Sequence, residues 1–584
     1  MNLPAKLSTE GVSRWLRSLA PLVIYLALSF AFFGRNVNWS EYYFGDSNDS
    51  LLFIWFLHWW PFALSHGLNP FITKYAWYPN GYNVTWSTSL GFFALIAWPV
   101  TALGGPVLSY NILMLSAPAL AGWTGFLLCR ELTGNWAASL IGGLFFGFSA
   151  PELNQLAAEL NLDSVFLIPL AALLCLRHLR GTLRRWPFII ALSLLLVAQL
   201  GMSTEMLAAL CLSGALCWGI FLTFAPAAAQ PSYWRLAADI ARAAPLVMLL
   251  AAPFLYYLVK GLPDFPSHIH PPGFQETDAL QFFIPATPVH SLRAALASIL
   301  QQCAGIAPDF FAYLSPPLWL ILALYFYRNI AASYVKALLA CACLLAALSL
   351  GLKLYINGHL TSIPLPWAIF SHIPLIGAIM PLRFLSFLTL ATAVAAALYL
   401  AGAKTPAARA RRYALAALAC IFLPPAHVQV LPQPWQVLPI FQRQTEYKWL
   451  RWPTHPFFTP EHIRQALGPM PNVLLLPDPV VGPGMAWQID AGMGFTQAEG
   501  YVGYTYLPEQ KWGLADELVW NQDPAFSTKF QAFCAAHQVD DILIAPGTPP
   551  AITTAIEALG WPHHMDSGIE VIKAPNSLSA LTHH

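Results

Sequence analysis

The sequence predicts an α-helical polytopic membrane protein with a small α/β domain at its C-terminus. The first observation is composition, because 57% of the 584 residues are apolar and only 10% are charged. A soluble protein carries about 25% charged residues, so a lipid bilayer is the expected solvent for this chain. The second observation is a series of apolar stretches before residue 428. The third is the rise in charge and proline content after it.

Eleven apolar stretches predict membrane spans, because a helix needs about 20 residues to cross the hydrocarbon core. The basic start of the chain resembles a signal peptide. The first stretch lacks a small-residue cleavage site, however, which favours an uncleaved first span. The predicted spans are residues 18–34, 108–129, 136–150, 164–176, 187–202, 206–224, 240–260, 309–327, 337–351, 384–402 and 413–426.

Residues 35–107 are expected to form the first outer loop, which contains two further apolar stretches, 51–64 and 90–104. At ~1.5 Å per residue these would be helices about 21–23 Å long, shorter than the ~30 Å hydrocarbon core. The three Trp residues and one His of the first stretch suit a helix at the membrane interface. The alternative is a pair of spans, which would leave the later topology unchanged.

The distribution of charge orients the predicted bundle. With the N-terminus in the cytoplasm, the cytoplasmic loops hold 16 basic residues and the outer loops of the same region hold six. Basic residues favour the cytoplasmic side, so this bias places the C-terminal domain outside. Eleven of the 14 acidic residues before residue 429 then face out. Glu159, Asp163 and Glu205 lie in short turns beside spans, where costly ionisable groups indicate function.

The C-terminal segment changes character and is expected to form a separate domain. We place the boundary between a membrane domain, residues 1–428, and an extracytoplasmic domain, residues 429–584. Strands that alternate with helices predict a small α/β domain. Its predicted elements are strands at Val473–Leu476 and Ile542–Ala545, a helix at Thr553–Leu559 and a last strand at Gly568–Lys573.

Short motifs follow one another in the first outer loop and beyond it. They are Gly45-Asp46, Trp55-Phe56-Leu57-His58-Trp59, His66-Gly67-Leu68-Asn69-Pro70, Tyr78-Pro79-Asn80-Gly81, a predicted cytoplasmic turn Arg130–Gly134 and a predicted outer turn Ser149–Pro151. This order, over residues 15–402, resembles the GT-C superfamily of membrane glycosyltransferases, and in particular a bacterial branch of it. Enzymes of that superfamily use sugars linked to polyprenyl phosphate, although a fold can host several functions.

The resemblance implies a catalytic base at the start of the first outer loop. Asp46 matches best because it follows Gly45, and Asp49 is the alternative. A carboxylate within hydrogen-bond reach can take the proton that an acceptor hydroxyl loses as it attacks the anomeric carbon. No metal-ligand spacing stands out, so no cofactor is certain. Asp46 and Asp49 together offer a site for a divalent cation.

Cationic donors are expected to stabilise the phosphate that leaves. Arg383 lies at the outer mouth of a span, and a guanidinium binds phosphate through two hydrogen bonds. The alternative for Arg383 is snorkelling at a helix end, and Lys74 is a second candidate cation. The remaining expected substrate contacts are Glu159, Asp163, Glu205, His58 and Asn69. We expect Asp46, Glu159 or Asp163, Glu205 and Arg383 to line one cavity.

The expected function is transfer of a sugar from a polyprenyl-phosphate donor to a glycan, lipid or protein acceptor, by an inverting reaction. The alternative is a non-enzymatic membrane protein that transports or assembles lipid-linked glycans. A transporter should carry charged or broken helices near mid-membrane, whereas the acids here gather at one face. The expected location is a bacterial inner membrane, with the site and the C-terminal domain in the periplasm. A net charge of +1 gives no sign of nucleic-acid binding.

Overall fold

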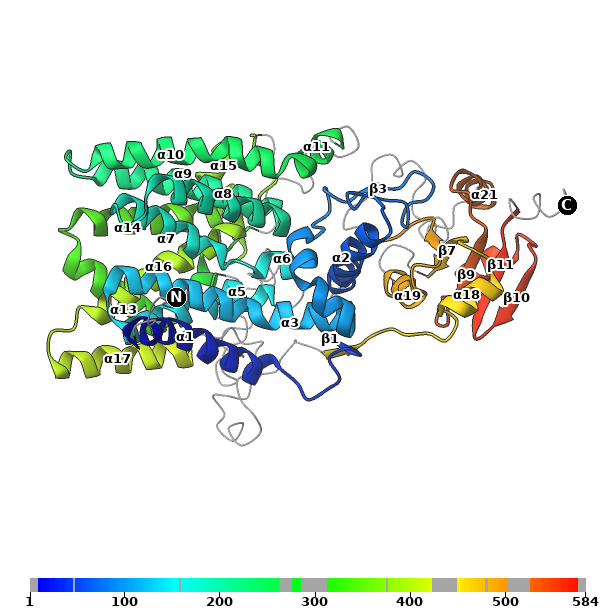
Figure 1. Cartoon of the computed structure of the whole chain (residues 1–584), viewed down its shortest axis with the longest axis horizontal. Coiled ribbons are helices and arrows are strands. Elements are labelled where there is room, and N and C mark those ends of the chain that lie inside the picture. Colours follow the sequence, from blue (N-terminus) through cyan, green and yellow to red (C-terminus); the bar gives the residue numbers. More distant parts are fainter. Residues whose placement is uncertain are drawn as a thin grey trace, which may run out of the picture.

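The computed structural model describes residues 9–45, 48–156, 159–261, 276–284, 312–373, 376–422, 449–477, 482–501 and 526–575. A helical bundle forms one end of the molecule and a small sheet-containing domain forms the other, with the first loop between them (Figure 1). The long helices of the bundle run roughly parallel to the long axis of the molecule.

The helices of the bundle follow the predicted spans closely. They are α1 (Thr9–Phe33), α3 (Gly91–Thr133), α4 (Trp136–Gly147), α7 (Leu167–Leu179), α8 (Arg185–Met202), α9 (Thr204–Phe224), α10 (Gln230–Leu250), α11 (Ala252–Lys260), α13 (Pro316–Asn329), α14 (Ser333–Ser349), α16 (Phe384–Ala401) and α17 (Pro406–Ile421). Over the described residues, each of the eleven predicted spans overlaps one of these helices or the pair α10 and α11.

Shorter elements lie between these helices. In the first loop they are β1 (Tyr42–Phe44), α2 (Asn48–Ser65), β2 (Ile72–Thr73) and β3 (Tyr82–Asn83). Further along they are α5 (Ala150–Gln155), α6 (Leu160–Asp163), η2 (Ala279–Phe282), β4 (Lys353–Ile356), β5 (His359–Pro364), α15 (Trp367–Phe370) and η3 (Pro381–Arg383).

The apolar helices make the chain an integral membrane protein. Within the described residues, five are long and apolar enough to cross a membrane, counting α6 with α7 and η3 with α16. The pair α10 and α11, bent by 75°, adds a sixth. Shorter apolar helices, α1 from Arg17 onward, α4 and α14, complete this set.

The second apolar stretch of the first loop and the span that follows it both lie in α3, where a kink at Gly105 separates them. Gly105 has φ of 86° and ψ of 164°, a non-helical conformation that glycine tolerates and other residues rarely adopt. The stretch at 90–104 is therefore a helix of its own, as predicted. At ~1.5 Å per residue, the part of α3 after the kink is about 42 Å long, enough to cross the ~30 Å hydrocarbon core.

Small residues allow α3 and α4 to pack closely. A Cβ on Gly143 would lie 2.3 Å from the carbonyl oxygen of Gly122, and a Cβ on Gly147 would lie 2.3 Å from that of Pro118. Glycine at such contacts is typical of membrane helices, which gain stability from close packing rather than from the hydrophobic effect. The contact fixes the end of α4, from which α5 and the candidate site continue.

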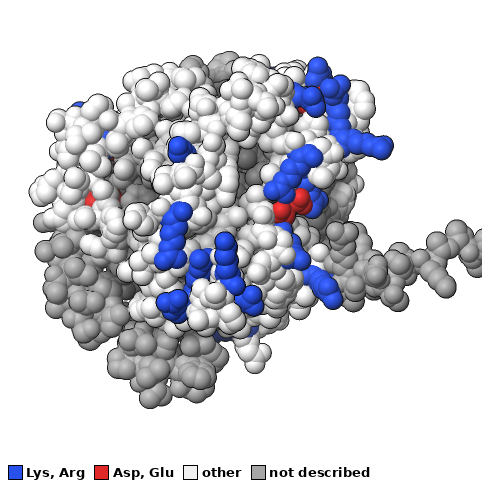
Figure 2. Space-filling model, turned by 90° about the vertical axis from the view of Figure 1, so that its left-hand side faces the viewer, with Lys and Arg blue, Asp and Glu red and all other residues white. Residues whose placement is uncertain are grey.

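Basic side chains gather at the end of the bundle that lies away from the sheet domain. Figure 2 shows several Lys and Arg side chains on this largely uncharged end, with few Asp or Glu. Among the described residues, Glu131 pairs with Arg177 and Arg180, and the buried Asp239 pairs with Arg242. This asymmetry agrees with the predicted separation of basic and acidic loops.

The C-terminal region contains a five-stranded sheet with the order β10-β11-β9-β7-β8. The parallel strands are β7, β8 and β9, and the antiparallel strands β11 and β10 extend the edge. The predicted strands and helix are confirmed. The elements are β6 (Trp449–Arg451), α18 (Pro460–Ala466), β7 (Asn472–Leu476), α19 (Gly484–Asp490), β8 (Thr496–Gln497), α21 (Phe526–Ala536), β9 (Asp541–Ile544), α22 (Pro550–Glu557), β10 (His563–Asp566) and β11 (Ile569–Lys573). The expected boundary at residue 428 lies outside the described residues.

The C-terminal region is bound to the first loop through hydrogen bonds. Strand β1 pairs with β6, which places Tyr42 opposite Arg451. The buried side chain of Gln488 accepts a hydrogen bond from Trp55 at 2.8 Å and donates to the carbonyl oxygen of Tyr75 at 2.8 Å. A buried amide with its partners satisfied gives a specific contact. The two ends of the chain therefore share one packed layer above the bundle.

Candidate active site

Helix α2 supports the start of the candidate site. Its three indole groups all donate hydrogen bonds: Trp55 to Gln488, Trp59 to the carbonyl oxygen of Pro70 at 2.9 Å, and Trp60 to that of Ser89 at 2.9 Å. Buried indoles with satisfied N–H groups hold a helix in one position. Asp49 lies in the first turn of this fixed helix.

Two hydroxyl-bearing groups contact the carboxylate of Asp49. The phenol of Tyr501, from the C-terminal region, donates a hydrogen bond to it. The carboxyl group of Glu159, directly before the first residue of α6, lies within hydrogen-bonding distance of the Asp49 carboxylate. Burial, and then the negative charge of Asp49, raise the pKa of Glu159 to about 8, whereas the charge of Arg383 opposes this shift. At neutral pH, Glu159 is therefore protonated and donates to Asp49.

Arg383 lies near Glu159, directly before the first residue of α16. Its side chain is only 7% exposed, and its Nε donates to Oε1 of Glu205 at 3.1 Å. The same oxygen accepts the backbone N–H of Met380 at 2.9 Å, so Glu205 holds Arg383 and its loop together. Hydrogen bonds of this kind set the orientation of the planar guanidinium. We call Asp49, Glu159, Glu205 and Arg383 the Asp49–Arg383 cluster.

Glu152 and Asp163 form a second acidic pair. Glu152 is fully buried and its Oε1 accepts a hydrogen bond from Ser386 at 3.1 Å. Asp163 is also fully buried, and neither of its carboxyl oxygens has a hydrogen-bond partner among the described residues. Two buried carboxyl groups at the end of a membrane bundle are costly. Ser386 lies three residues after Arg383, so this pair contacts the first turn of the helix that follows Arg383.

The other three predicted contact residues lie elsewhere in the first loop. His58 is nine residues along α2 from Asp49, about 14 Å at ~1.5 Å per residue, and burial lowers its pKa to about 4. Asn69 uses its side chain to bind the hydroxyl of Tyr257 at 2.7 Å and a backbone N–H within its own turn. Lys74 is exposed directly after β2. These three residues are therefore part of the first loop and not of the Asp49–Arg383 cluster.

Asp46 lies outside the described residues, so its predicted place in the cavity stays a prediction. The same holds for a divalent cation between Asp46 and Asp49. Within the described part of the chain, no group of three or more His, Cys, Asp or Glu side chains could hold a metal ion. Asp49 is instead contacted by Tyr501 and lies in a cluster that already contains a guanidinium.

The structure adds three residues that the sequence did not single out for the site. Tyr501 contacts Asp49 although 452 residues separate them, Glu152 accepts a hydrogen bond from Ser386, and Tyr110 of α3 donates to Ser50 at 3.0 Å, next to Asp49 in the chain. Only Glu152 gave a signal, as an acidic residue beside a span. The fold and site define a polytopic membrane protein with a polar site between its bundle and a small sheet domain.

No protein-family model matches the chain, and no curated protein matches it. Among solved structures it is similar to the oligosaccharyltransferase AglB from Archaeoglobus fulgidus in complex with an inhibitory peptide and a dolichol-phosphate. That match has a TM-score of 0.46 and 13% identity, over 91% of this chain and 70% of that one. The A. fulgidus oligosaccharyltransferase in complex with Zn and sulfate gives a TM-score of 0.47 and 12% identity, over 90% and 68%.

ArnT from Cupriavidus metallidurans, bound to undecaprenyl phosphate, is a further similar structure. Its TM-score is 0.40 and its identity 13%, over 98% of this chain and 99% of that one. At these identities and TM-scores, the similarity carries no conclusion about the function of this chain.

Proposed function

We propose that the protein is a membrane glycosyltransferase that moves a sugar from a polyprenyl-phosphate donor to an acceptor. The observation that carries the proposal is the Asp49–Arg383 cluster. It combines a carboxylate able to accept a proton with a buried guanidinium able to bind phosphate, at one end of a membrane bundle. This pairing fits an acceptor hydroxyl and a phosphate leaving group on the same site.

In the proposed reaction, the acceptor hydroxyl oxygen attacks the anomeric carbon of the donor sugar. The bond from that carbon to the phosphate oxygen breaks, and its electron pair leaves on the phosphate. The hydroxyl proton passes to the carboxylate of Asp49, or of Asp46. A single displacement of this kind inverts the anomeric centre. Arg383 stabilises the negative charge that develops on the leaving phosphate.

The hydrogen bonds of Arg383 support this role. Its Nε is occupied by Glu205, and one terminal nitrogen contacts the sulfur of Met380 at 3.3 Å, a weak acceptor. A guanidinium has five N–H donors, so others remain to bind phosphate oxygens. Glu205 then acts through Arg383, by orienting it, rather than by contacting the sugar. Glu159 and Asp163 stay proposed contacts for sugar hydroxyls.

The charge distribution supports an orientation for the site. The basic end in Figure 2 would face the cytoplasm, because basic loops are retained on that side. The Asp49–Arg383 cluster lies at the other end and would open to the periplasm of a bacterial inner membrane. A polyprenyl tail could then lie between spans while its phosphate reaches Arg383. The acceptor would be a glycan, lipid or protein.

The test uses purified protein in lipid vesicles with a panel of polyprenyl-phosphate sugars. Release of polyprenyl phosphate is the measurement. We expect Asp46→Asn or Asp49→Asn to abolish release without loss of folded protein, since an amide keeps the shape but cannot accept the proton. The exposed Glu461→Gln in α18 is a matched control. Full activity in both single variants and the double variant would refute an Asp base. Donor binding without any release would favour the transport alternative.

A divalent cation at Asp46 and Asp49 has its own test. Loss of release on chelation, with recovery after Mg²⁺ or Mn²⁺ is added, would support it. Unchanged release in the chelator would leave the two carboxylates as candidate bases only.

A further inference from the structure

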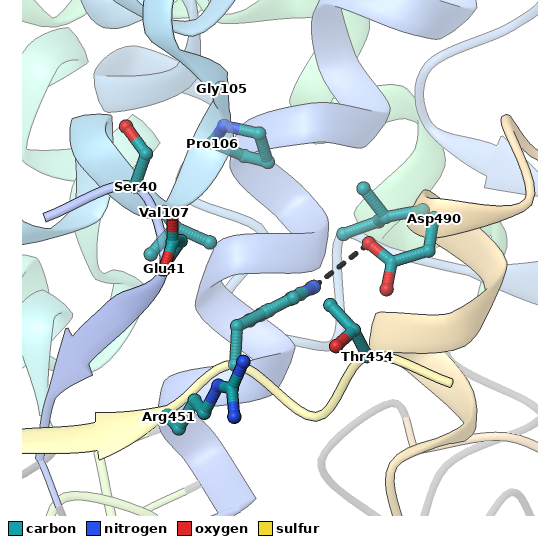
Figure 3. A pocket seen from close by; sticks show the side chains of 10 residues that line it. Ser40, Glu41, Gly105, Pro106, Val107, Arg451, Thr454 and Asp490 are labelled. Carbon is teal, nitrogen blue, oxygen red and sulfur yellow. Dashed lines mark hydrogen bonds between the residues drawn. The ribbon is translucent and has the colours of Figure 1, made fainter. Parts of the chain in front are cut away.

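A pocket of about 340 Å³ lies on the seam between the first loop and the C-terminal region. Figure 3 shows Glu41 and Val107 on one side and Asp490 and Thr454 on the other, with Arg451 at the lower edge. The walls come from the start of β1, the break in α3, and the segment that joins β6 to α19. The pocket exists only because β1 pairs with β6.

The polar groups of this pocket have hydrogen-bonding capacity to spare. Arg451 is exposed and has no hydrogen bond or ion pair to the described residues. Asp490 accepts a hydrogen bond from Trp452 at 2.9 Å through one oxygen, and its other oxygen is buried without a partner among the described residues. Glu41 is bound by Asn38 through one oxygen at 2.6 Å. A buried acceptor without a partner is costly, so the unpaired oxygen of Asp490 favours a ligand that donates a hydrogen bond to it.

The charges of the pocket limit the ligand. Two carboxylates and one guanidinium leave a net negative charge, which disfavours a phosphate or a carboxylate ligand. An entirely apolar ligand would leave all three charges unpaired. A sugar satisfies every group: its hydroxyls donate to Glu41 and Asp490, its oxygens accept from Arg451, and its C–H face covers Pro106 and Val107. A volume of this size is at the lower end of small-molecule sites, about 300–1,000 Å³.

We propose that this pocket binds a neutral or amino-bearing sugar residue of the acceptor glycan. The proposal rests on the proposed glycosyltransferase function for its acceptor role. Strand β1 leads from Glu41 toward Gly45, about 10 Å at ~3.3 Å per residue, and α2 then begins with Asp49 in its first turn. The pocket therefore holds a part of the glycan away from the reacting hydroxyl and helps to select the acceptor.

The first experiment measures binding to the purified full-length chain in detergent. Saturation-transfer NMR with maltose and with glucosamine reports sugar binding, and inorganic phosphate serves as an anionic competitor. We expect Asp490→Asn and Arg451→Gln to weaken sugar binding about tenfold, the loss of one good hydrogen bond to a charged group. Thr454→Trp, which fills the mouth without a change in charge, should also abolish binding. Exposed Arg464→Gln in α18 is the control.

Sugar binding that is unchanged in all three pocket variants, or that phosphate displaces, would overturn the proposal. Absence of binding of either sugar to the native chain would also overturn it. Asp49→Asn should retain the NMR signal of the pocket. If Asp46→Asn, Asp49→Asn and the double variant all retain full transfer activity, the proposed function fails while the pocket is still measured by NMR. With transfer established, the pocket variants should raise the acceptor KM and leave kcat nearly unchanged.

Discussion

Arg383 lies against Glu205, with its Nε 3.1 Å from the carboxylate oxygen Oε1, although 178 residues separate the two. The pair joins the N-terminal turn of α9 to that of α16, at the end of the bundle that faces the sheet domain. A guanidinium held on one side by a carboxylate presents its other N–H groups in a fixed direction. Snorkelling to water, the alternative for Arg383, does not describe a side chain that is 7% exposed.

The first prediction concerns this arginine. Arg383→Gln should lower kcat about 10²–10³-fold, as for loss of one donor to a developing oxyanion. Arg383→Lys should recover part of the rate only, because a lysine cannot bind phosphate through a planar fork. Release of polyprenyl phosphate is the measurement, and exposed Arg411→Gln at the opposite end is the control. Equal rates for Arg383→Gln and the native protein would exclude a role in leaving-group stabilisation.

The second prediction concerns Tyr501, a positioning residue from the C-terminal region. Tyr501→Phe should slow transfer, because Asp49 loses the hydrogen bond that orients its carboxylate. The unfolding temperature of the variant should equal that of the native protein. Exposed Tyr327→Phe in α13 is the control. In a double-mutant cycle with Asp49→Asn, additive losses would contradict a role through Asp49.

The third prediction is a pH dependence of stability. The pKa of Glu159 is raised to about 8, so the folded state holds this proton more tightly than the unfolded chain, whose value is near 4.5. The stabilising contribution is complete below that lower value and is lost as the pH rises toward about 8. Glu159→Gln keeps a neutral donor and removes the titration. Its unfolding temperature should fall less between pH 5 and pH 9 than that of the native protein. Parallel curves for the two proteins would contradict the shift.

The fourth prediction concerns the docking of the C-terminal region. Gln488→Leu should lower the free energy of unfolding by about 1–3 kcal/mol for each buried group left unpaired, beginning with the indole of Trp55. Limited proteolysis should then release the C-terminal region more readily. Exposed Gln531→Leu in α21, whose amide contacts only Ser527, is the matched control. Equal proteolysis of both variants would show that the docking of the C-terminal region on the first loop does not depend on Gln488.

The fifth prediction concerns topology. An impermeant thiol reagent added to intact cells should label Thr548→Cys, in the C-terminal region, and should not label Thr182→Cys, in the basic turn between α7 and α8. Both positions lie in loops, so the substitutions should be tolerated. Labelling at position 182 from outside, or no labelling at position 548, would reverse the proposed orientation.

The spans and the sheet strands were predictable because their signals are local. A run of apolar residues reports a membrane helix by itself, and the eleven predicted stretches each have a helix. The α/β alternation of the C-terminal region is equally local. The kink at Gly105 falls between the predicted stretches 90–104 and 108–129, whereas the span predicted at 240–260 was wrongly continuous, because α10 and α11 meet there at a bend of 75°.

The site was predictable only in part, because its contacts are long-range. Glu159, Glu205 and Arg383 stood out as ionisable groups beside spans, and the structure brings all three together with Asp49. Nothing in the sequence connects Tyr501 to Asp49, because its partner depends on how the sheet domain docks. His58 and Asn69 came from motifs of the first loop and Lys74 from its charge, and neither signal reveals which side chains face the cavity.

The pairing of β1 with β6 also means that the site is completed late in synthesis. The carboxylate of Asp49 is made 452 residues before its phenolic partner Tyr501. The helices between β1 and β6 are made before these two strands can pair. A partly synthesised chain therefore contains Asp49 but has neither the pocket beside Arg451 nor the contact from Tyr501.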